Sequence, residues 1–329
     1  MILGKGGAEM GRPKKKQVEL RTYDLTNEPH LVIHRGPEWR ISPVESLVLH
    51  FHNSFEVGIC LTESAFIRFD EERVPIQCGD IVCVARNVAH TIWSAPGRES
   101  EWCFIHLDPE QILGEGFTGK LPDLPGFLKM LSEGRIVLRA AENAWAEALL
   151  RQMVQETERR ETGYVLCVWG LCAAFFTRLL RIMQQDEPKE RASTLTTTVS
   201  LALDYLYTHY QEKFSLETLA QISHMSPTNF RRRFGEETGT NPLAFLHQVR
   251  VMKSCDLLRT TGADVAEIAA QVGYASMSSF NRHFLELVGC TPSAWRGMRS
   301  DSQERILLQL NGWQRAETDE EIEERNRRI

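Results

Sequence analysis

Residues 231–233 are three consecutive arginines, and they stand between Phe230 and Phe234 in the stretch MSPTNFRRRF. On a helix the two phenylalanines, one turn apart, face the same side, so they hold the helix while the guanidinium groups point elsewhere. Arginine suits phosphate oxygens, and it binds the O6 and N7 atoms of guanine through two parallel hydrogen bonds. The stretch therefore predicts a nucleic-acid contact, and the competing interpretation is a solvated, charged helix face.

Local signals predict the elements that position these arginines. Ser226 is a good N-cap, and Pro227 suits the first helical position because its missing N–H is not needed there. The preceding stretch SLETLAQISH predicts another short helix, capped by Ser215. Two short helices joined by a tight turn, the second polar and basic outside, are typical of a helix-turn-helix.

The pattern occurs a second time in VAEIAAQVGYASMSSFNRHFLELVGCTP. At an offset of 50 residues, four positions of the first copy recur: Phe230, Phe234, Gly239 and Pro242 correspond to Phe280, Phe284, Gly289 and Pro292. Ala220 and Ala269 are 49 apart, so the second turn holds one extra residue, and Gly273 suits a positive φ there. Residues 242–261 between the copies have helical spacing and predict a rigid connecting helix.

Residues 195–299 resemble the DNA-binding domain of AraC/XylS-type transcription regulators. The resemblance rests on SLETLAQISHMSPTNFRRRFGEETGTNP, on RVMKSCDLLRTT and, most specifically, on VAEIAAQVGYASMSSFNRHFLELVGCTPSAWR. Two positions depart from the usual pattern: Ser254 replaces a common alanine, and Leu285 stands where a basic residue is frequent, which removes a phosphate contact. The resemblance implies two recognition helices in successive major-groove segments, about 34 Å apart.

The resemblance also assigns DNA contacts to positions on the two recognition helices: Thr228, Asn229, Arg231, Arg232, Ser276, Met277, Ser278, Asn281 and Arg282. Arg233 is expected to reach the DNA backbone or to pair with Glu237 at i+4. The four phenylalanines are expected in the core. This region carries ten Lys or Arg against nine Asp or Glu, so its basic character depends on local placement.

Polar side chains alternate with apolar ones in residues 47–61, LVLHFHNSFEVGICL. His50, His52, Ser54 and Glu56 share one parity, which is typical of a strand with a polar face, unless a turn at Asn53–Ser54 breaks it. Residues 78–93 predict a strand, a turn and a strand. Short strands separated by turn signals indicate a small β-barrel or sandwich.

This first half resembles a cupin barrel. The resemblance places His50, His52, Glu56 and His90 at the spacing of the cupin metal-ligand set, and such residues are suitable ligands for a divalent transition metal. The sequence departs from the pattern at Glu63, Ala85 and Asn87, where Gly, Pro and Gly are usual.

We expect these four side chains to hydrogen-bond a small polar effector, with no cofactor and no metal. Two alternatives stay open: the same four residues bind a metal, or they close a polar network in an empty barrel. His106, Trp93 and Trp102 are further candidates to line the cavity, with packing favoured for the tryptophans.

Composition adds limits. The net charge is −6, so nucleic-acid binding must rest on a local patch. Eight cysteines without a CxxC pair, and no secretory signal, favour a reducing cytoplasm. The apolar run 164–176 is shorter than a membrane span, and Arg178 and Arg181 interrupt its continuation, so no membrane association is expected.

The expected fold class is α+β, with a cupin-like barrel, a helical linker and an all-α bipartite helix-turn-helix domain. The expected segments are a disordered tail (1–17), a sensor domain (18–140), a helical linker (141–186), a DNA-binding domain (195–299) and a charged extension (300–329). Of the two helices expected in 141–183, the second is apolar nearly all round, so it needs cover from the barrel or from a second subunit.

The main hypothesis is a cytoplasmic transcription regulator, not an enzyme, that binds promoter DNA and contacts RNA polymerase. A small polar effector, a sugar or related metabolite, would control it from the barrel, and the protein is expected to form a homodimer. A metal-dependent cupin enzyme fused to a DNA-binding domain is one alternative. A ligand-free barrel that docks a partner protein is the other.

Overall fold

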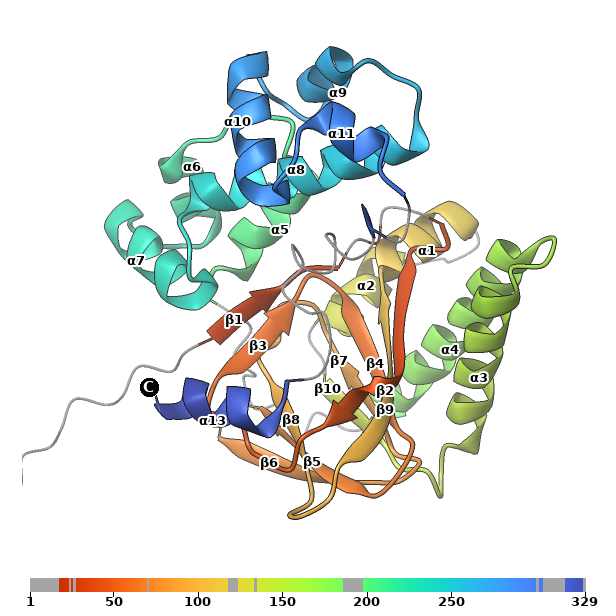
Figure 1. Ribbon diagram of the computed structural model, residues 1–329. Coiled ribbons are helices and arrows are strands. Elements are labelled where there is room, and N and C mark those ends of the chain that lie inside the picture. Colours follow the sequence, from red (N-terminus) through yellow and green to blue (C-terminus); the bar gives the residue numbers. More distant parts are fainter. Residues whose placement is uncertain are drawn as a thin grey trace, which may run out of the picture.

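The computed structural model describes nine segments of the chain: residues 18–23, 25, 28–69, 71–117, 124–132, 135–185, 198–299, 302–303 and 317–327. The expected tail (1–17), the linker stretch 186–194 and residues 304–316 of the C-terminal extension lie outside them. The described residues form a strand-rich N-terminal part and a helical C-terminal part (Figure 1), so the expected α+β class is confirmed.

The N-terminal part is a barrel built from three sheets (Figure 1). The strands are β1 (Val18–Arg21), β2 (Leu31–Ile41), β3 (Leu49–His52), β4 (Phe55–Cys60), β5 (Ser64–Phe69), β6 (Glu72–Gln77), β7 (Ile81–Val84), β8 (Thr91–Ser94), β9 (Ser100–Leu107) and β10 (Arg135–Leu138). One sheet has the order β10-β7-β4-β9-β2, a second β6-β5-β8, and β1 pairs in parallel with β3. An isolated bridge between His50 and His90 connects β3 to the residue just before β8.

The alternating stretch 47–61 is two strands and not one. A bend at Asn53–Ser54 separates β3 from β4, as the sequence allowed. In β4 the apolar Phe55, Val57 and Ile59 pack outward against helices, while Glu56 points into the barrel. The polar parity of the sequence is therefore the inner face of the barrel.

Helices cover the outer face of the five-stranded sheet. They are α1 (Pro109–Gly116), α2 (Leu124–Ser132), α3 (Ala144–Arg159) and α4 (Tyr164–Gln185). The length expected for the apolar segment is wrong, because α4 has 22 residues and is long and apolar enough, by these measures alone, to cross a membrane. In this fold its Val168, Cys172 and Phe175 are buried in the core beneath the sheet, while Leu166 is 71% exposed.

The C-terminal part is all-helical, with α5 (Ser200–Thr208), α6 (Leu216–Ile222), α7 (Pro227–Thr238), α8 (Pro242–Thr260), α9 (Val265–Gln271), α10 (Met277–Val288) and α11 (Pro292–Arg296). The expected connecting helix is α8, which runs between the α6–α7 and α9–α10 pairs (Figure 1). Its first half contributes Phe245 and Val249 to one core, and its second half contributes Val251 and Leu258 to the other. The two cores therefore share one rigid rod.

The charged C-terminal stretch contains a surface helix. This helix, α13 (Asp319–Arg327), does not extend the DNA-binding part, but lies against the barrel (Figure 1). Ile322 is its buried residue, 6% exposed. The end of the described chain therefore returns to the N-terminal domain.

Candidate functional site

The first helix-turn-helix forms as the local signals predict. The Ser215 hydroxyl caps α6 by accepting from the Thr218 N–H at 3.1 Å, and Ser226 caps α7. Phe230 and Phe234 are fully buried, with ring centroids 5.5 Å apart. The polar residues of α7 are thereby turned outward.

All four candidate DNA contacts of α7 are exposed: Thr228, Asn229, Arg231 and Arg232. Arg232 is held along the helix surface, because its guanidinium lies 2.7 Å from the Glu236 carboxylate and donates to the Asn229 side-chain oxygen at 2.9 Å. Surface pairs of this kind are weak and break readily. The Arg232 guanidinium therefore has a preferred position on the helix surface, but it can leave Glu236 at little energetic cost to contact DNA.

The expected pair between Arg233 and Glu237 is not what the structure shows. The Glu237 carboxylate accepts from the Thr198 hydroxyl and from the Val199 N–H, at the start of the helical part. Because Glu237 is engaged there, the i,i+4 ion pair on α7 is the one formed by Arg232. Arg233 is exposed on the same helix.

The second helix-turn-helix repeats the design with stronger caps. Asp264 and Glu267 form a reciprocal capping box on α9, and the Ser276 hydroxyl caps α10 by accepting from the Ser279 N–H. Gly273 has φ of 90°, as its place in the longer turn predicts. All five candidate contacts of this copy are exposed: Ser276, Met277, Ser278, Asn281 and Arg282.

Not every basic residue of the helical part is available to DNA. Arg250 is buried, and its guanidinium donates to the Tyr210 carbonyl at 2.6 Å and to the Glu212 carbonyl at 2.9 Å. Arg296 donates to the Ala263 carbonyl at 2.5 Å. These two arginines fasten loops to helices, a role that the sequence pattern did not reveal.

The predicted polar residues of the barrel converge on one carboxylate. His52 Nε2 lies 3.1 Å from Glu56 Oε2, and His90 Nε2 lies 3.6 Å from Glu56 Oε1. His106 joins them, because β4 and β9 pair with Glu56 opposite His106, and its Nδ1 lies 3.9 Å from the carboxylate. The His50 ring is 4.2 Å from the His90 ring, so the four predicted residues and His106 form one buried cluster.

The cluster has an unusual charge balance. Burial alone would raise the pKa of the Glu56 carboxyl, but hydrogen bonding with His52 and His90 and their positive charge hold that pKa well below its usual range. Burial lowers the pKa of His52, and it lowers the pKa of His50 and of His106 well below the usual value. Glu56 is therefore favoured as an anion, while burial favours the neutral forms of His50, His52 and His106.

The hydrogen bonds of the His52 and His90 rings determine which ring nitrogen faces the Glu56 carboxylate. Nδ1 of His52 lies 2.9 Å from the Ser54 carbonyl, and Nδ1 of His90 lies 3.0 Å from the Val88 carbonyl. Each Nδ1 must carry the proton to donate there, so a neutral ring directs its Nε2 lone pair toward Glu56. Lone pairs facing a carboxylate repel unless a proton or a cation lies between them.

This donor set fits a divalent transition metal. Two triads share Glu56: one adds His50 and His90, and the other adds His52 and His106. Within each triad the candidate ligand atoms lie within 4.8 Å of one another. Histidines that donate Nδ1–H to a carbonyl and offer Nε2 are the usual ligands of such ions. The same residues would hold the ion, with Glu56 as the carboxylate ligand, and a bound ion would relieve the repulsion.

Sequence reasoning missed two aromatic partners of the cluster. The Tyr23 ring stacks on His106 with centroids 3.6 Å apart, and the His34 ring lies 5.3 Å from the His106 ring. Burial lowers the pKa of His34 to about 4. The pairing of β2 with β9 brings His34 near His106, whereas Tyr23 follows the end of β1 and no periodicity of the sequence signals it. Trp102 packs on Phe104, as the sequence favoured.

Two of the departures from the cupin pattern keep the backbone that glycine would provide. Glu63 has φ of 58° and Asn87 has φ of 62°, both in the left-handed region. Asparagine tolerates this conformation well, whereas glutamate adopts it at some cost. The substitutions therefore change side chains without changing the path of the chain.

The loop that carries His90 also touches the helical part. The Asn87 N–H donates to the His52 carbonyl at 2.9 Å, and the Asn87 side chain donates to the Asp204 carboxylate at 3.1 Å. Arg86 lies 3.5 Å from the same Asp204, which belongs to α5. One short loop thus contacts the buried cluster on one side and the helical part on the other.

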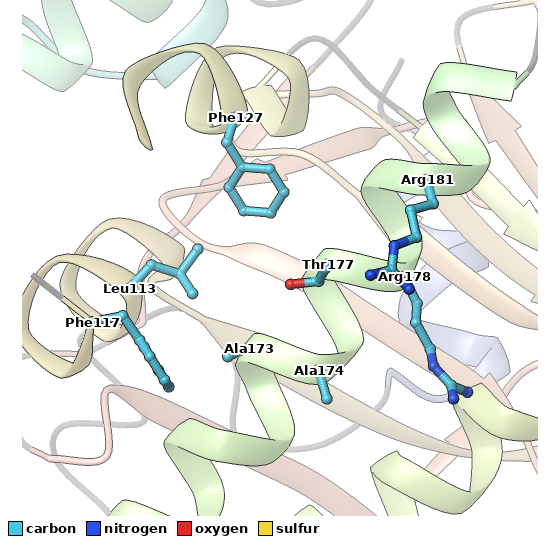
Figure 2. A pocket seen from close by; sticks show the side chains of 8 residues that line it. All are labelled: Leu113, Phe117, Phe127, Ala173, Ala174, Thr177, Arg178 and Arg181. Atoms are coloured by element: carbon cyan, nitrogen blue, oxygen red, sulfur yellow. The ribbon is translucent and has the colours of Figure 1, made fainter. Parts of the chain in front are cut away.

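A separate pocket of about 390 Å³ lies outside the barrel, between α1, α2 and α4. Figure 2 shows Leu113 and Phe127 facing Ala173 and Thr177 across this space, with Arg181 farther along α4. Arg178, which also lines it, stacks over the Trp145 ring at 5.2 Å. The pocket is mainly apolar and includes none of the predicted barrel residues.

Two family models match the chain: an AraC-like ligand binding domain over residues 42–196 and a helix-turn-helix domain over residues 219–298. The RCS-specific HTH-type transcriptional activator RclR of Escherichia coli K12 is 31% identical over 221 residues, 66% of this chain and 75% of RclR. The chain belongs to the AraC family of transcription regulators. As such it is a DNA-binding transcription regulator with an N-terminal ligand-binding domain, and the resemblance found in the sequence is confirmed.

Two further comparisons cover different shares of the chain. The uncharacterized HTH-type transcriptional regulator YdeC of Bacillus subtilis 168 is 22% identical over 77% of this chain and 87% of its own length. The crystal structure of the DNA-binding domain of AdpA in complex with a target DNA is 34% identical, covering 30% of this chain and 90% of that domain, with a TM-score of 0.29.

Proposed function

We propose that this regulator reads promoter DNA through α7 and α10, and that a small polar effector in its barrel controls that binding. The proposed DNA contacts are nine exposed residues of these helices and of the α10 N-cap: Thr228, Asn229, Arg231, Arg232, Ser276, Met277, Ser278, Asn281 and Arg282. The proposed domain limits are 18–140 for the sensor, 141–186 for the linker and 195–299 for the DNA-binding domain. RNA polymerase is the proposed partner at the promoter, and the cytoplasm the proposed location.

The geometry of the two helix pairs supports the DNA proposal. α8 has 19 residues and is about 28 Å long at the usual rise of an α-helix. A rod of that length, buried in both cores, fixes α7 and α10 relative to each other, and we propose that it spaces them for two successive major-groove segments, about 34 Å apart. The exposed side chains include arginine and asparagine, which suit guanine and adenine edges.

One observation carries the effector proposal: the buried cluster around Glu56 is continuous with the loop that contacts Asp204. His50, His52, Glu56 and His90 are the proposed effector contacts. A ligand that changes the position of His90 must move the loop that carries it. In that loop Asn87 hydrogen-bonds to His52 of β3 and to Asp204 of α5. Two arrangements of the domains are in equilibrium, and the ligand shifts this equilibrium toward the arrangement that binds it more tightly. The size of the shift is set by the difference between its affinities for the two arrangements.

Glu56→Gln tests this proposal, and Glu101→Gln is the matched control, because Glu101 is a partly exposed carboxylate on β9. We expect Glu56→Gln to abolish the effector response of a reporter promoter, while operator affinity in vitro stays within about twofold, since α7 and α10 do not need the barrel interior. A thermal-shift panel of sugars and related polar metabolites identifies the effector by a raised melting temperature. An unchanged reporter response in Glu56→Gln contradicts the effector contact.

A second candidate occupant of the cluster is a divalent transition metal. The observation that favours it is the orientation of the His52 and His90 rings, whose Nε2 atoms have no hydrogen-bond donor facing them in the described structure. A metal alone would make the barrel a metal-dependent sensor, and a metal with an open position would suit an enzyme. Elemental analysis of purified protein separates these readings from a metal-free barrel.

We also propose a homodimer formed through the exposed face of α4. Leu166 is 71% exposed, and Cys167 and Gly170 on the same face are also exposed. An apolar face of this kind on a long helix is typical of a protein contact. Leu166→Glu is expected to yield monomers in light scattering, and a monomeric native protein contradicts the proposal.

A further inference from the structure

The helix α13 closes one end of the barrel. It lies across the strands beside β3 and β8 (Figure 1). The Ser42 hydroxyl donates to the Asp319 carboxylate at 2.5 Å, and the Leu47 N–H donates to the Asn326 side chain at 2.8 Å. The segment between β2 and β3 therefore forms a specific seat for this helix, although nearly 280 residues separate them in the chain.

A small cavity lies beneath the seated helix. Its wall includes Arg21, His50, Thr91 and Phe104 from the barrel, and Ile322 from α13 closes it. The cavity volume is about 40 Å³, close to the roughly 30 Å³ of one water in the liquid and far below the roughly 300–1,000 Å³ of ligand pockets. The side chains of the C-terminal segment thus fill a space that opens onto His50, a member of the buried cluster.

The same segment places a carboxylate beside a buried cation. Arg21 is 4% exposed, and Glu317 Oε2 lies 3.8 Å from its guanidinium. Glu317 also pairs with Arg325 at 2.7 Å. Burial lowers the pKa of Arg21 to about 10, which shows how strongly this site disfavours a cation without an anionic neighbour.

We propose that the barrel mouth beneath α13 binds a small organic acid, and that residues 317–327 occupy this site when no acid is bound. The carboxylate of the acid takes the place of Glu317 beside Arg21, and its apolar body takes the place of Ile322 against Phe104. This inference rests on the proposed effector-binding role of the barrel, but it takes the effector to be an organic acid in place of a sugar and adds Arg21 to its contacts.

The site has a direct route to the DNA-binding helices. Arg21 is the last residue of β1, and Val18 of the same strand packs on the core that contains Phe230 and Phe234. Phe51 of β3, which pairs with β1, is fully buried in that core. An acid that changes the partner of Arg21 therefore acts on a strand that supports α7.

The test uses the full chain and three straight-chain acids, butyrate, hexanoate and octanoate, against the corresponding uncharged amides in calorimetric titrations. At least one acid is expected to bind, with its amide weaker by roughly tenfold or more, because the amide cannot pair with Arg21. Ile322→Ser weakens the seat of the helix, so it is expected to tighten acid binding by roughly tenfold. Glu323→Ser, at an exposed position of α13, is the control and leaves acid binding within about twofold.

A second measurement needs no variant. Saturating acid is expected to speed hydrogen exchange of the α13 amides in the native protein, because the helix leaves its seat. Equal binding of acids and amides, an unchanged affinity in Ile322→Ser, or full protection of α13 with acid bound overturns the proposal. The proposal is also overturned if Ile322→Ser binds none of the three acids at concentrations up to about 10 mM.

Operator footprinting on the same preparations separates this inference from the proposed function. An intact footprint without acid binding refutes the acid site alone. A protein that leaves its promoter unprotected refutes the proposed regulator instead.

Discussion

Arg232→Ala is the substitution whose effect the structure defines most closely. In the free protein the Arg232 side chain is 54% exposed, and its guanidinium contacts Glu236 and Asn229. If it reads a base edge, it must exchange these contacts for the O6 and N7 atoms of a guanine. The loss of binding free energy in Arg232→Ala is therefore the energy of the guanine contact minus that of the Glu236 pair in the free protein.

Two contact energies set that difference. A bidentate contact to guanine is worth about 1–3 kcal/mol of discrimination, whereas an exposed i,i+4 ion pair is worth about 0.3–0.5 kcal/mol. We expect Arg232→Ala to weaken binding to the cognate operator by about 0.5–2.7 kcal/mol, or roughly 2- to 100-fold. Glu236→Gln removes the competing pair, so it is expected to tighten binding by about twofold.

The assay is fluorescence anisotropy on the operator, defined first by a genome-wide binding map, and on a scrambled duplex of equal length. Arg233→Ala is the matched control on the same exposed helix. It is expected to weaken both duplexes alike and to make the salt slope shallower by about 0.9, as one lost phosphate contact requires. If Arg232→Ala weakens the scrambled duplex as much as the operator, the base-reading role is refuted.

Footprinting is expected to show two protected major-groove segments per subunit, about one helical turn apart, and a single segment contradicts the bipartite arrangement. Gly273→Ala is expected to lower the free energy of unfolding by about 2–4 kcal/mol in urea titrations, since its φ is 90° and a Cβ would lie 2.5 Å from the Gln211 carbonyl oxygen. Gly289 has φ of 80° but no atom near the place of a Cβ, so Gly289→Ala is expected to lower the free energy of unfolding by only about 1–2 kcal/mol. Equal losses in the two variants refute the clash at Gly273. If the cluster holds a metal, elemental analysis finds a stoichiometric transition ion that His52→Ala loses, and a metal-free native protein excludes it.

The sequence predicts the DNA-binding part well because its signals are local. Ser226 with Pro227 and the pair Phe230 and Phe234 fix where α7 begins and which side it buries. The second copy of the same pattern, around Phe280 and Phe284, then supports the interpretation as a repeated helix-turn-helix. Even here one choice was beyond the sequence: two i,i+4 pairs are possible on α7, and Glu237 is engaged by residues that lie 38 and 39 positions earlier.

The barrel could be predicted only in outline. The resemblance to a cupin barrel placed His50, His52, Glu56 and His90 in one site, and His106 was a further candidate. The contact of His106 with Glu56 depends on the register of β4 and β9, and that of His34 with His106 on the register of β2 and β9. The turn at Asn53–Ser54 changed one expected strand into two. The seat of α13 depends on contacts between opposite ends of the chain, for which no periodicity gives a signal.

The double contact of Asn87 limits how freely such regulators exchange their halves. Asn87 is 2% exposed, and its side chain donates to Asp204, so a foreign DNA-binding domain without a carboxylate at that position leaves a buried amide unpaired. The penalty for such a group is about 1–3 kcal/mol, and Arg86 loses an ion-pair partner at the same time. A chimera designed to place a new promoter under this sensor should therefore carry Asp204 across the junction. Recombination in nature faces the same requirement, so residues 86, 87 and 204 are inherited best as one unit.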